Sequence, residues 1–214
     1  MLPPHAPPSF SDRSTLWNSV EQTEKSNNSQ LAREIELALP VELSREEQTR
    51  LVREYCSSQF VSKGMCADFN IHDTGSGNPH AHILLTMRPL DEKGAWAAKS
   101  KKEYVLDESG EKILLPSGRY KTRKIDLMDW NRQENADLWR KAWADMANDF
   151  LEQNGSAERI DHRSNAERGI DEIPTVHMGV AACQMEKKGI ATEKGELNRN
   201  IQKANRLIRE IRAQ

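Results

Sequence analysis

Two neighbouring runs of the chain, MCADFNIHD and HAHILLTMRP, alternate between apolar and polar residues around the loop DTGSGNP. A period of two puts successive side chains on opposite faces of a strand, so each run predicts a β-strand with one apolar face. A loop rich in Gly, Asn and Pro is typical of a turn, which predicts an antiparallel hairpin. This hairpin constrains the fold most, because its register decides which side chains face the core.

The polar face of the predicted hairpin carries three histidines. His80 and His82 are two residues apart on one strand, and His72 has the matching phase on the other. Residues i and i+2 lie about 7 Å apart along one face of a strand, so the three imidazoles can converge on one ion. Neutral imidazole binds first-row divalent metals, and three protein ligands leave positions open, as in catalytic sites. The pattern predicts a metal site; for the HxH pair alone, surface histidines are the alternative.

A third strand is predicted from the alternating run LAREIELALP, which Pro40 ends. Its polar face carries Glu34 and Glu36, which we expect near the histidines. The alternative is that both glutamates serve only solubility, since strand faces exposed to water often carry them.

Two helices accompany these strands. Ser44 and Glu47 form a capping box that predicts a helix over about residues 44–60. Asp129 is predicted to cap a later helix. The apolar residues of that helix recur at helical spacing and predict its buried stripe: Trp139, Ala142, Trp143, Met146 and Phe150.

Residues 93–125 are predicted to form an inserted, exposed hairpin. Positions 99–124 hold eight basic and four acidic residues, a local charge of +4. Such a patch can track DNA phosphates, and a solvated charged hairpin is the alternative. Trp96, in the run GAWAAKS, is the tryptophan expected to face a base or a partner. The predicted phosphate-binding residues are Lys99, Lys101, Lys102, Arg119, Lys121, Arg123 and Lys124.

Composition narrows the class of protein. The 214 residues, 36% of them hydrophobic, suffice for one sizeable core, and a net charge of −2 excludes a uniformly basic nucleic-acid binder. Three cysteines without CxxC spacing favour a reducing, cytoplasmic compartment. No apolar run approaches the roughly 18 residues of a membrane span, and the start MLPPHAPPSF lacks the features of a signal peptide.

Two domains are expected, residues 1–182 and a helical extension or linker over residues 183–214. The extension carries a heptad-like stripe that hints at a coiled coil. The members of the stripe are Leu197, Ile201, Ala204, Ile208 and Ile211.

Three runs together resemble a known family: REIELALPVELSREEQ, CADFNIHDTGSGNPHAHILLTMRPL and RIDHRSNAERGIDEIPTVHMG. They are similar to the relaxase domain of MobA/MobL-type (MobQ class) plasmid mobilisation proteins, over nearly the whole chain. The resemblance implies a two-layer α/β (α+β) fold with a mainly antiparallel sheet, helices on one face, and a C-terminal helix.

The resemblance also implies an activity. Relaxases of this family nick one DNA strand at a plasmid origin of transfer through a tyrosyl–DNA intermediate. A divalent ion, expected to be manganese or magnesium, is implied at His72, His80 and His82, and Glu34 or Glu36 is implied to orient the tyrosine or the metal. The implied partners are single-stranded or hairpin origin DNA and other mobilisation proteins, in the cytoplasm.

The family's nucleophilic tyrosine is expected to be missing from this chain. The resemblance puts it near an AAYR-like run in a segment before MLPPHAPPSF, and Tyr55, Tyr104 and Tyr120 do not match that position. Tyr55 is predicted to pack in the core, whereas the other two belong to the inserted hairpin. Two alternatives therefore stay open: a truncated, non-catalytic fragment that binds origin DNA, and a metal-dependent phosphodiesterase that uses water. His162 and His177 are predicted to be structural.

Overall fold

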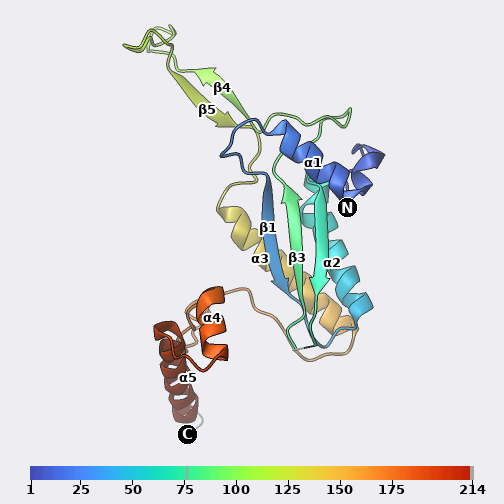
Figure 1. Cartoon of the computed structure of the whole chain (residues 1–214), viewed down its shortest axis with the longest axis vertical. Coiled ribbons are helices and arrows are strands. Elements are labelled where there is room, and N and C mark those ends of the chain that lie inside the picture. The colour runs from blue at the N-terminus through green and yellow to red at the C-terminus, as the bar shows by residue number, and fades with distance from the viewer. Residues whose placement is uncertain (76, 213–214) are drawn as a thin grey trace. The chain divides into compact units, whose positions relative to one another are not determined.

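The computed structural model of the protein describes residues 1–75 and 77–212 (Figure 1). The chain divides into two compact units, Met1–Asp161 and His162–Gln214, and each is described by itself. Within the described residues, no helix is both long and apolar enough to cross a membrane.

The first unit is built on a three-stranded antiparallel sheet in the order β1-β3-β2. β3 is central, and it pairs with β2 as the predicted hairpin and with β1 on its other side. Alternate residues of β3, including Ala81, Ile83 and Leu85, are fully buried, as the period of two predicts. The strands are β1 (Ala32–Ala38), β2 (Ala67–His72) and β3 (His80–Thr86).

Two helices, α2 (Arg45–Gln59) and α3 (Glu134–Gln153), cover the apolar face of this sheet (Figure 1). The predicted capping box is present, since Ser44 accepts from the backbone N–H of Glu47 and the Glu47 side chain accepts from that of Ser44. The opposite face of the sheet keeps its polar side chains. The fold is therefore the predicted two-layer α/β arrangement with helices on one face.

The start of α3 differs from the prediction that Asp129 caps it. The N-cap is Gln133, whose side chain makes no capping hydrogen bond. The backbone carbonyl of Asp129 instead accepts from Asn135 Nδ2 at 2.7 Å, which closes an intervening turn. Trp130, in that turn, is buried against the core, so packing rather than the cap decides where the helix begins.

A short helix, α1 (Arg13–Thr23), packs beside the sheet after the 3-10 turn η1 (Pro8–Ser11). Trp96 stacks on Phe10 with ring centroids 5.4 Å apart, and its indole N–H donates to Ser19 Oγ at 2.8 Å. Both partners of this tryptophan are internal, so the expectation that it faces a base or a partner was wrong. Trp96 turns inward because its ring packs on the apolar ring of Phe10 and its indole N–H finds a hydrogen-bond acceptor on α1.

The predicted insertion forms a separate two-stranded antiparallel sheet, β4 (Ser100–Tyr104) and β5 (Thr122–Asp126). It leaves the three-stranded sheet at the end opposite the β2–β3 turn (Figure 1). The rings of Tyr104 and Tyr120 meet edge to face at 5.8 Å across the hairpin, and Lys112 lies over both. Both tyrosines are half exposed, so their contact is cross-strand packing on the surface.

The second unit contains α4 (Gly179–Lys187) and α5 (Glu193–Arg212), and the expected domain boundary after residue 182 falls inside α4. Ile201, in the heptad-like stripe, is buried, whereas Leu197 and Ile211 are exposed. Two asparagines of α5 hold the preceding loop. Asn205 exchanges two hydrogen bonds with the backbone of Ile173, and Asn198 does the same with Val176.

Candidate metal centre

The three predicted histidines lie together on the polar face of the sheet. His72 is directly opposite His80 in the β2–β3 register, and His82 follows two residues along β3. One ring nitrogen from each lies within 4.8 Å of the other two. All three side chains reach solvent, so the cluster lies at the surface of the open face. The structure thus brings together the set that strand periodicity predicts.

Hydrogen bonds determine which nitrogen His80 and His82 can offer to an ion. His80 Nδ1 lies 2.9 Å from the backbone carbonyl of Asn78, and His82 Nδ1 lies 2.9 Å from Glu34 Oε1. A carbonyl and a carboxylate only accept, so in the neutral form of each ring Nδ1 carries the proton and Nε2 has the lone pair that can bind an ion. Metal-binding histidines generally have such partners, which fix the tautomer and the ring orientation.

The spacing of the donor atoms fits a first-row ion. His72 Nδ1 and His80 Nε2 are 3.3 Å apart. An ion about 2.1 Å from each of two nitrogens holds them roughly 3.0–3.5 Å apart in octahedral or tetrahedral geometry. The donor set fits the implied divalent metal, with three nitrogens from the protein and room for further ligands on the solvent side.

The register of β1 separates the two candidate glutamates. Glu36 is directly opposite His82, and Glu34 is opposite Leu84, yet Glu34 is the one that reaches diagonally to the imidazole. Among the contacts of the described residues, Glu36 makes no hydrogen bond to a histidine. Glu34 therefore orients His82, whereas Glu36 is an exposed neighbour on the same strand face.

The turn that joins the histidine-bearing strands β2 and β3 is supported from α2, a feature missed in the sequence. Asp73 Oδ2 accepts from Arg45 Nη2 at 2.9 Å, and Asp73 Oδ1 accepts from the Gly75 N–H at 2.9 Å. Gly75 has φ 72°, a conformation that side chains rarely adopt. Asp73 thus ties the first residue of α2 to the turn. The only sequence signal was the capping box, which puts Arg45 at the start of that helix.

Helix α1 packs against β2 at Asp68, four residues before His72. Asp68 is largely buried and accepts from Arg13 Nε at 2.7 Å and from Trp17 Nε1 at 3.0 Å. Asp68 lies on the same face of β2 as His72. Helix α1 therefore borders the open face only at the end of β2 that holds Asp68, which sequence periodicity alone does not reveal.

The predicted phosphate-binding residues lie away from the histidines. The β4–β5 hairpin starts beyond the Thr86 end of β3, whereas His80 begins the strand, about 20 Å away along it. Several of these residues are paired with acids: Lys101 and Arg123 with Glu103, and Lys124 with Asp126. The patch keeps exposed basic side chains at Lys102, Arg119 and Lys121.

Lys99 differs from the rest of that predicted patch. Its ammonium lies 2.7 Å from a carboxylate oxygen of Glu24, and only 27% of its side chain is exposed. Its charge is thus directed inward, where a phosphate has little access to it.

No tyrosine of the described chain lies at the histidine cluster. Tyr55 is buried in the core, as predicted, and its hydroxyl donates to the Trp139 carbonyl at 3.0 Å. Burial raises the pKa of this phenol well above its ordinary value. His162 and His177 belong to the second unit, where both are exposed, and their structural role stays a prediction.

Comparison with known proteins gives the family. A sequence model of the MobA/MobL family matches residues 1–188. The chain is 36% identical to a probable mobilization protein MobA of Bifidobacterium longum, over 99% of this chain and 40% of that protein. It is 34% identical to mobilization protein A of Escherichia coli, over 94% of this chain and 27% of the relative.

Conjugal transfer proteins show the same likeness. TraA of Agrobacterium fabrum is 36% identical over 92% of this chain and 18% of its own length. A structure described as the molecular basis of vancomycin resistance transfer in Staphylococcus aureus aligns with a TM-score of 0.62 and 35% identity, over 77% of this chain and 73% of that one. The chain spans less than half the length of the curated relatives it matches. The protein belongs to the MobA/MobL family.

Proposed function

We propose that this chain is the DNA-processing part of a plasmid mobilisation protein, a relaxase-type unit that nicks one strand at an origin of transfer. The observation that carries the proposal is the cluster of His72, His80 and His82 in a MobA/MobL chain, with its ring nitrogens converging. The work takes place on plasmid DNA in the cytoplasm, and the partners are origin DNA and other mobilisation proteins.

The residues of the open face divide the work. The three imidazoles would hold a divalent ion, whose chemistry is to stabilise negative charge on the oxygens of the scissile phosphate. Because the ligands are neutral, they leave the charge of the ion available to the phosphate. Glu34 holds the His82 ring and its tautomer. Three nitrogen donors favour manganese over magnesium, since magnesium prefers oxygen ligands and retains water.

Exposed basic residues of the hairpin, chiefly Lys102, Arg119 and Lys121, are proposed to contact the DNA backbone. Such contacts supply affinity and little sequence information, and they weaken as salt rises. Tyr104 and Tyr120 expose aromatic surface beside them, on which an unpaired base can stack.

A second candidate function is binding of origin DNA without cutting. It is favoured by the placement of the tyrosines in the described residues, one in the core and two on the hairpin, all away from the histidines. In this second function the chain still binds the metal and the DNA, but it forms no covalent bond to the DNA.

Calorimetric titration with manganese tests the metal centre. We expect one ion to bind per chain, and His80→Ala combined with His82→Ala to abolish the binding. His177→Ala in the second unit is the matched control and is expected to bind normally. Unaltered manganese binding by the double variant would remove the proposed centre.

A nicking assay separates the candidate functions. The substrate is a supercoiled plasmid carrying the non-coding DNA next to the gene, with manganese present. A covalent protein–DNA product supports the relaxase reading and would overturn binding without cutting. Nicking without that product points to hydrolysis by water, and DNA binding without nicking supports the second candidate.

A further inference from the structure

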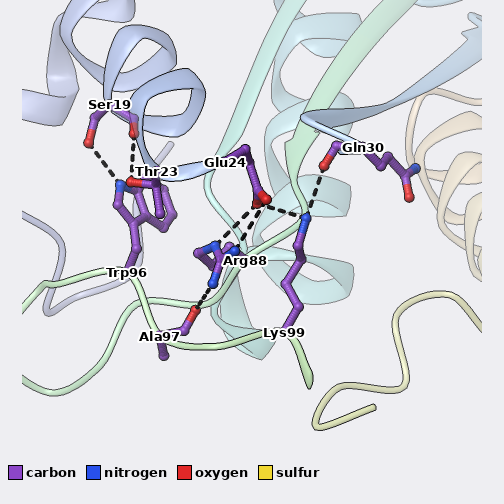
Figure 2. A network of polar contacts seen from close by, with 8 residues as sticks. All are labelled: Ser19, Thr23, Glu24, Gln30, Arg88, Trp96, Ala97 and Lys99. Atoms are coloured by element: carbon purple, nitrogen blue, oxygen red, sulfur yellow. Dashed lines mark hydrogen bonds and ion pairs between the residues drawn. The ribbon is translucent and has the colours of Figure 1, made fainter. Parts of the chain in front are cut away.

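The root of the β4–β5 hairpin holds a carboxylate enclosed by two cations (Figure 2). The side chain of Glu24 is only 6% exposed. Arg88 donates to both of its oxygens, from Nε and Nη2, each at 3.2 Å. Lys99 Nζ lies 2.7 Å from Glu24 Oε1. We call this group of three residues the Glu24 anchor.

Each member of the anchor comes from a different part of the fold. Glu24 directly follows α1, Arg88 follows β3, and Lys99 directly precedes β4. The cations also bind main-chain carbonyls, since Arg88 Nη1 donates to Ala97 at 2.8 Å and Lys99 Nζ donates to Gln30 at 3.2 Å. The anchor therefore joins the end of α1, the end of the central strand and the segment that leads into the hairpin.

The surroundings make this junction specific. Burial alone would raise the pKa of Glu24, but the hydrogen bonds from Arg88 and Lys99 outweigh it, and the pKa lies below its ordinary value. A largely buried charge without a partner is strongly unfavourable, so the three groups hold one arrangement. The indole of Trp96 adds a contact to Ser19, one turn earlier on α1 (Figure 2).

Helix α1 extends this junction to the metal-binding sheet. Near its start, Arg13 and Trp17 bind Asp68 on β2, the strand that carries His72. Just past its end, Glu24 holds the segment that leads into the hairpin. Asp68 pairs with Leu84, toward the hairpin end of β2 and four residues before His72. The same short helix thus joins the root of the hairpin to the strand that carries His72 (Figure 1).

We propose that Glu24 is a positioning residue for DNA: with Arg88 and Lys99, it fixes the basic hairpin relative to the histidine face so that one strand contacts both. The inference rests on the proposed function. Lys99 then belongs to the support of the hairpin and not to its phosphate-binding surface. Holding two sites in a set relation makes the second contact intramolecular, which raises affinity without any added contact.

Electron paramagnetic resonance tests the structural half of this proposal. Nitroxides are attached to Ser57→Cys on α2 and Ser117→Cys on the hairpin, in a Cys183→Ser background, because Cys183 is the exposed native thiol. We expect a narrow distance distribution in the parent and a broad one in Glu24→Gln. Glu21→Gln, an exposed acid on α1, is the matched control and should leave the distribution narrow.

DNA binding tests the functional half. The probes are fluorescent oligothymidylates of about 8 and about 30 nucleotides, a short one for the histidine face and a long one that also reaches the hairpin. With manganese present, the parent should prefer the long probe. Glu24→Gln should lose on the order of tenfold to a hundredfold in long-probe affinity. Its affinity for the short probe and for manganese should stay unchanged.

The variant Lys99→Met tests whether Lys99 positions the hairpin or contacts a phosphate directly. It also replaces Glu24→Gln as the test variant if Glu24→Gln does not fold. A phosphate ligand would lower the salt slope by about one and leave the distances narrow. An anchor residue broadens the distances, which is our expectation. Narrow distances together with an intact long-probe preference in the Glu24 variant would overturn the inference. Failure of the parent to bind either probe would overturn the proposed function and the DNA role of the anchor, whereas the distances still decide whether Glu24 fixes the hairpin.

Discussion

The three-stranded sheet and the β4–β5 hairpin are both antiparallel, yet different forces hold them in place. One face of the sheet is buried against α2 and α3, so its register and orientation follow from apolar packing. The strands of the hairpin contain no buried residue, and the hairpin is attached at its root through the Glu24 anchor. The contrast shows that a sheet with one buried face holds three histidines together through packing, whereas an exposed hairpin needs polar contacts to fix its direction.

Truncating an apolar side chain should show the largest difference in stability between the sheet and the hairpin. Leu85→Ala removes a fully buried side chain of β3 and is expected to lower the free energy of unfolding by about 2–5 kcal/mol. Leu106→Ala on the hairpin, where the residue is 53% exposed, should change it by less than about 0.5 kcal/mol. Urea denaturation measures both. Equal losses would mean that the hairpin has a packed core of its own.

The glutamates beside the histidines give the next largest effect. Glu34→Gln weakens the acceptor that holds His82 Nδ1–H, so manganese affinity should fall about 10- to 100-fold. Glu36→Gln removes the same charge from the same strand face and should leave the affinity close to that of the parent. Calorimetry compares the manganese affinity of the two variants. Equal losses of affinity would mean that Glu34 acts only through its negative charge and not through its hydrogen bond to His82.

Salt dependence sharpens the comparison further. Replacing Lys102, Arg119 and Lys121 together by Gln should make the plot of log affinity for single-stranded DNA against log salt less steep by about 2. His80→Ala, measured without manganese, should not alter this slope, because without its ion the histidine cluster makes no ionic contact with a phosphate. Fluorescence anisotropy at several salt concentrations provides the measurement. If the triple substitution leaves the slope unchanged, the basic residues of the hairpin do not contact DNA phosphates.

Acid should loosen the hairpin before it disturbs the sheet. The folded pKa of Glu24 lies below its ordinary value of 4.5, so the anchor is fully present above about pH 4.5. It is lost as the pH falls through the lower folded value, where Glu24 takes up a proton. The Ser57–Ser117 distance distribution should therefore broaden below pH 4.5. As the pH first falls below 4.5, the near-ultraviolet circular dichroism of the packed aromatic core should stay unchanged. In Glu24→Gln the distance distribution should be broad at every pH.

Local pattern was sufficient for much of the fold. The period of two predicted β2, β3 and the shared direction of His72, His80 and His82, because side-chain direction in a strand depends only on position along it. The capping box at Ser44 predicted the start of α2, because both of its hydrogen bonds lie within one turn. The cap predicted at Asp129 was wrong, because burial of Trp130 governs that turn.

Contacts between distant segments were beyond such patterns. That Glu34 and not Glu36 binds His82 depends on the diagonal reach of one side chain between the paired strands β1 and β3, which no local signal specifies. Lys99 looks like its basic neighbours in the sequence, and only its meeting with Glu24, 75 positions earlier, distinguishes it.

The sequence by itself determined the three strands of the main sheet, the start of α2, the buried face of the sheet and the identity of the three histidines. The tertiary structure alone decided which carboxylate orients His82, which lysine supports the hairpin, and how α1 links β2 to that hairpin. The physical reason is the range of the interactions. Alternation and capping act within a few residues, whereas a buried charge finds its partner only after the chain has folded.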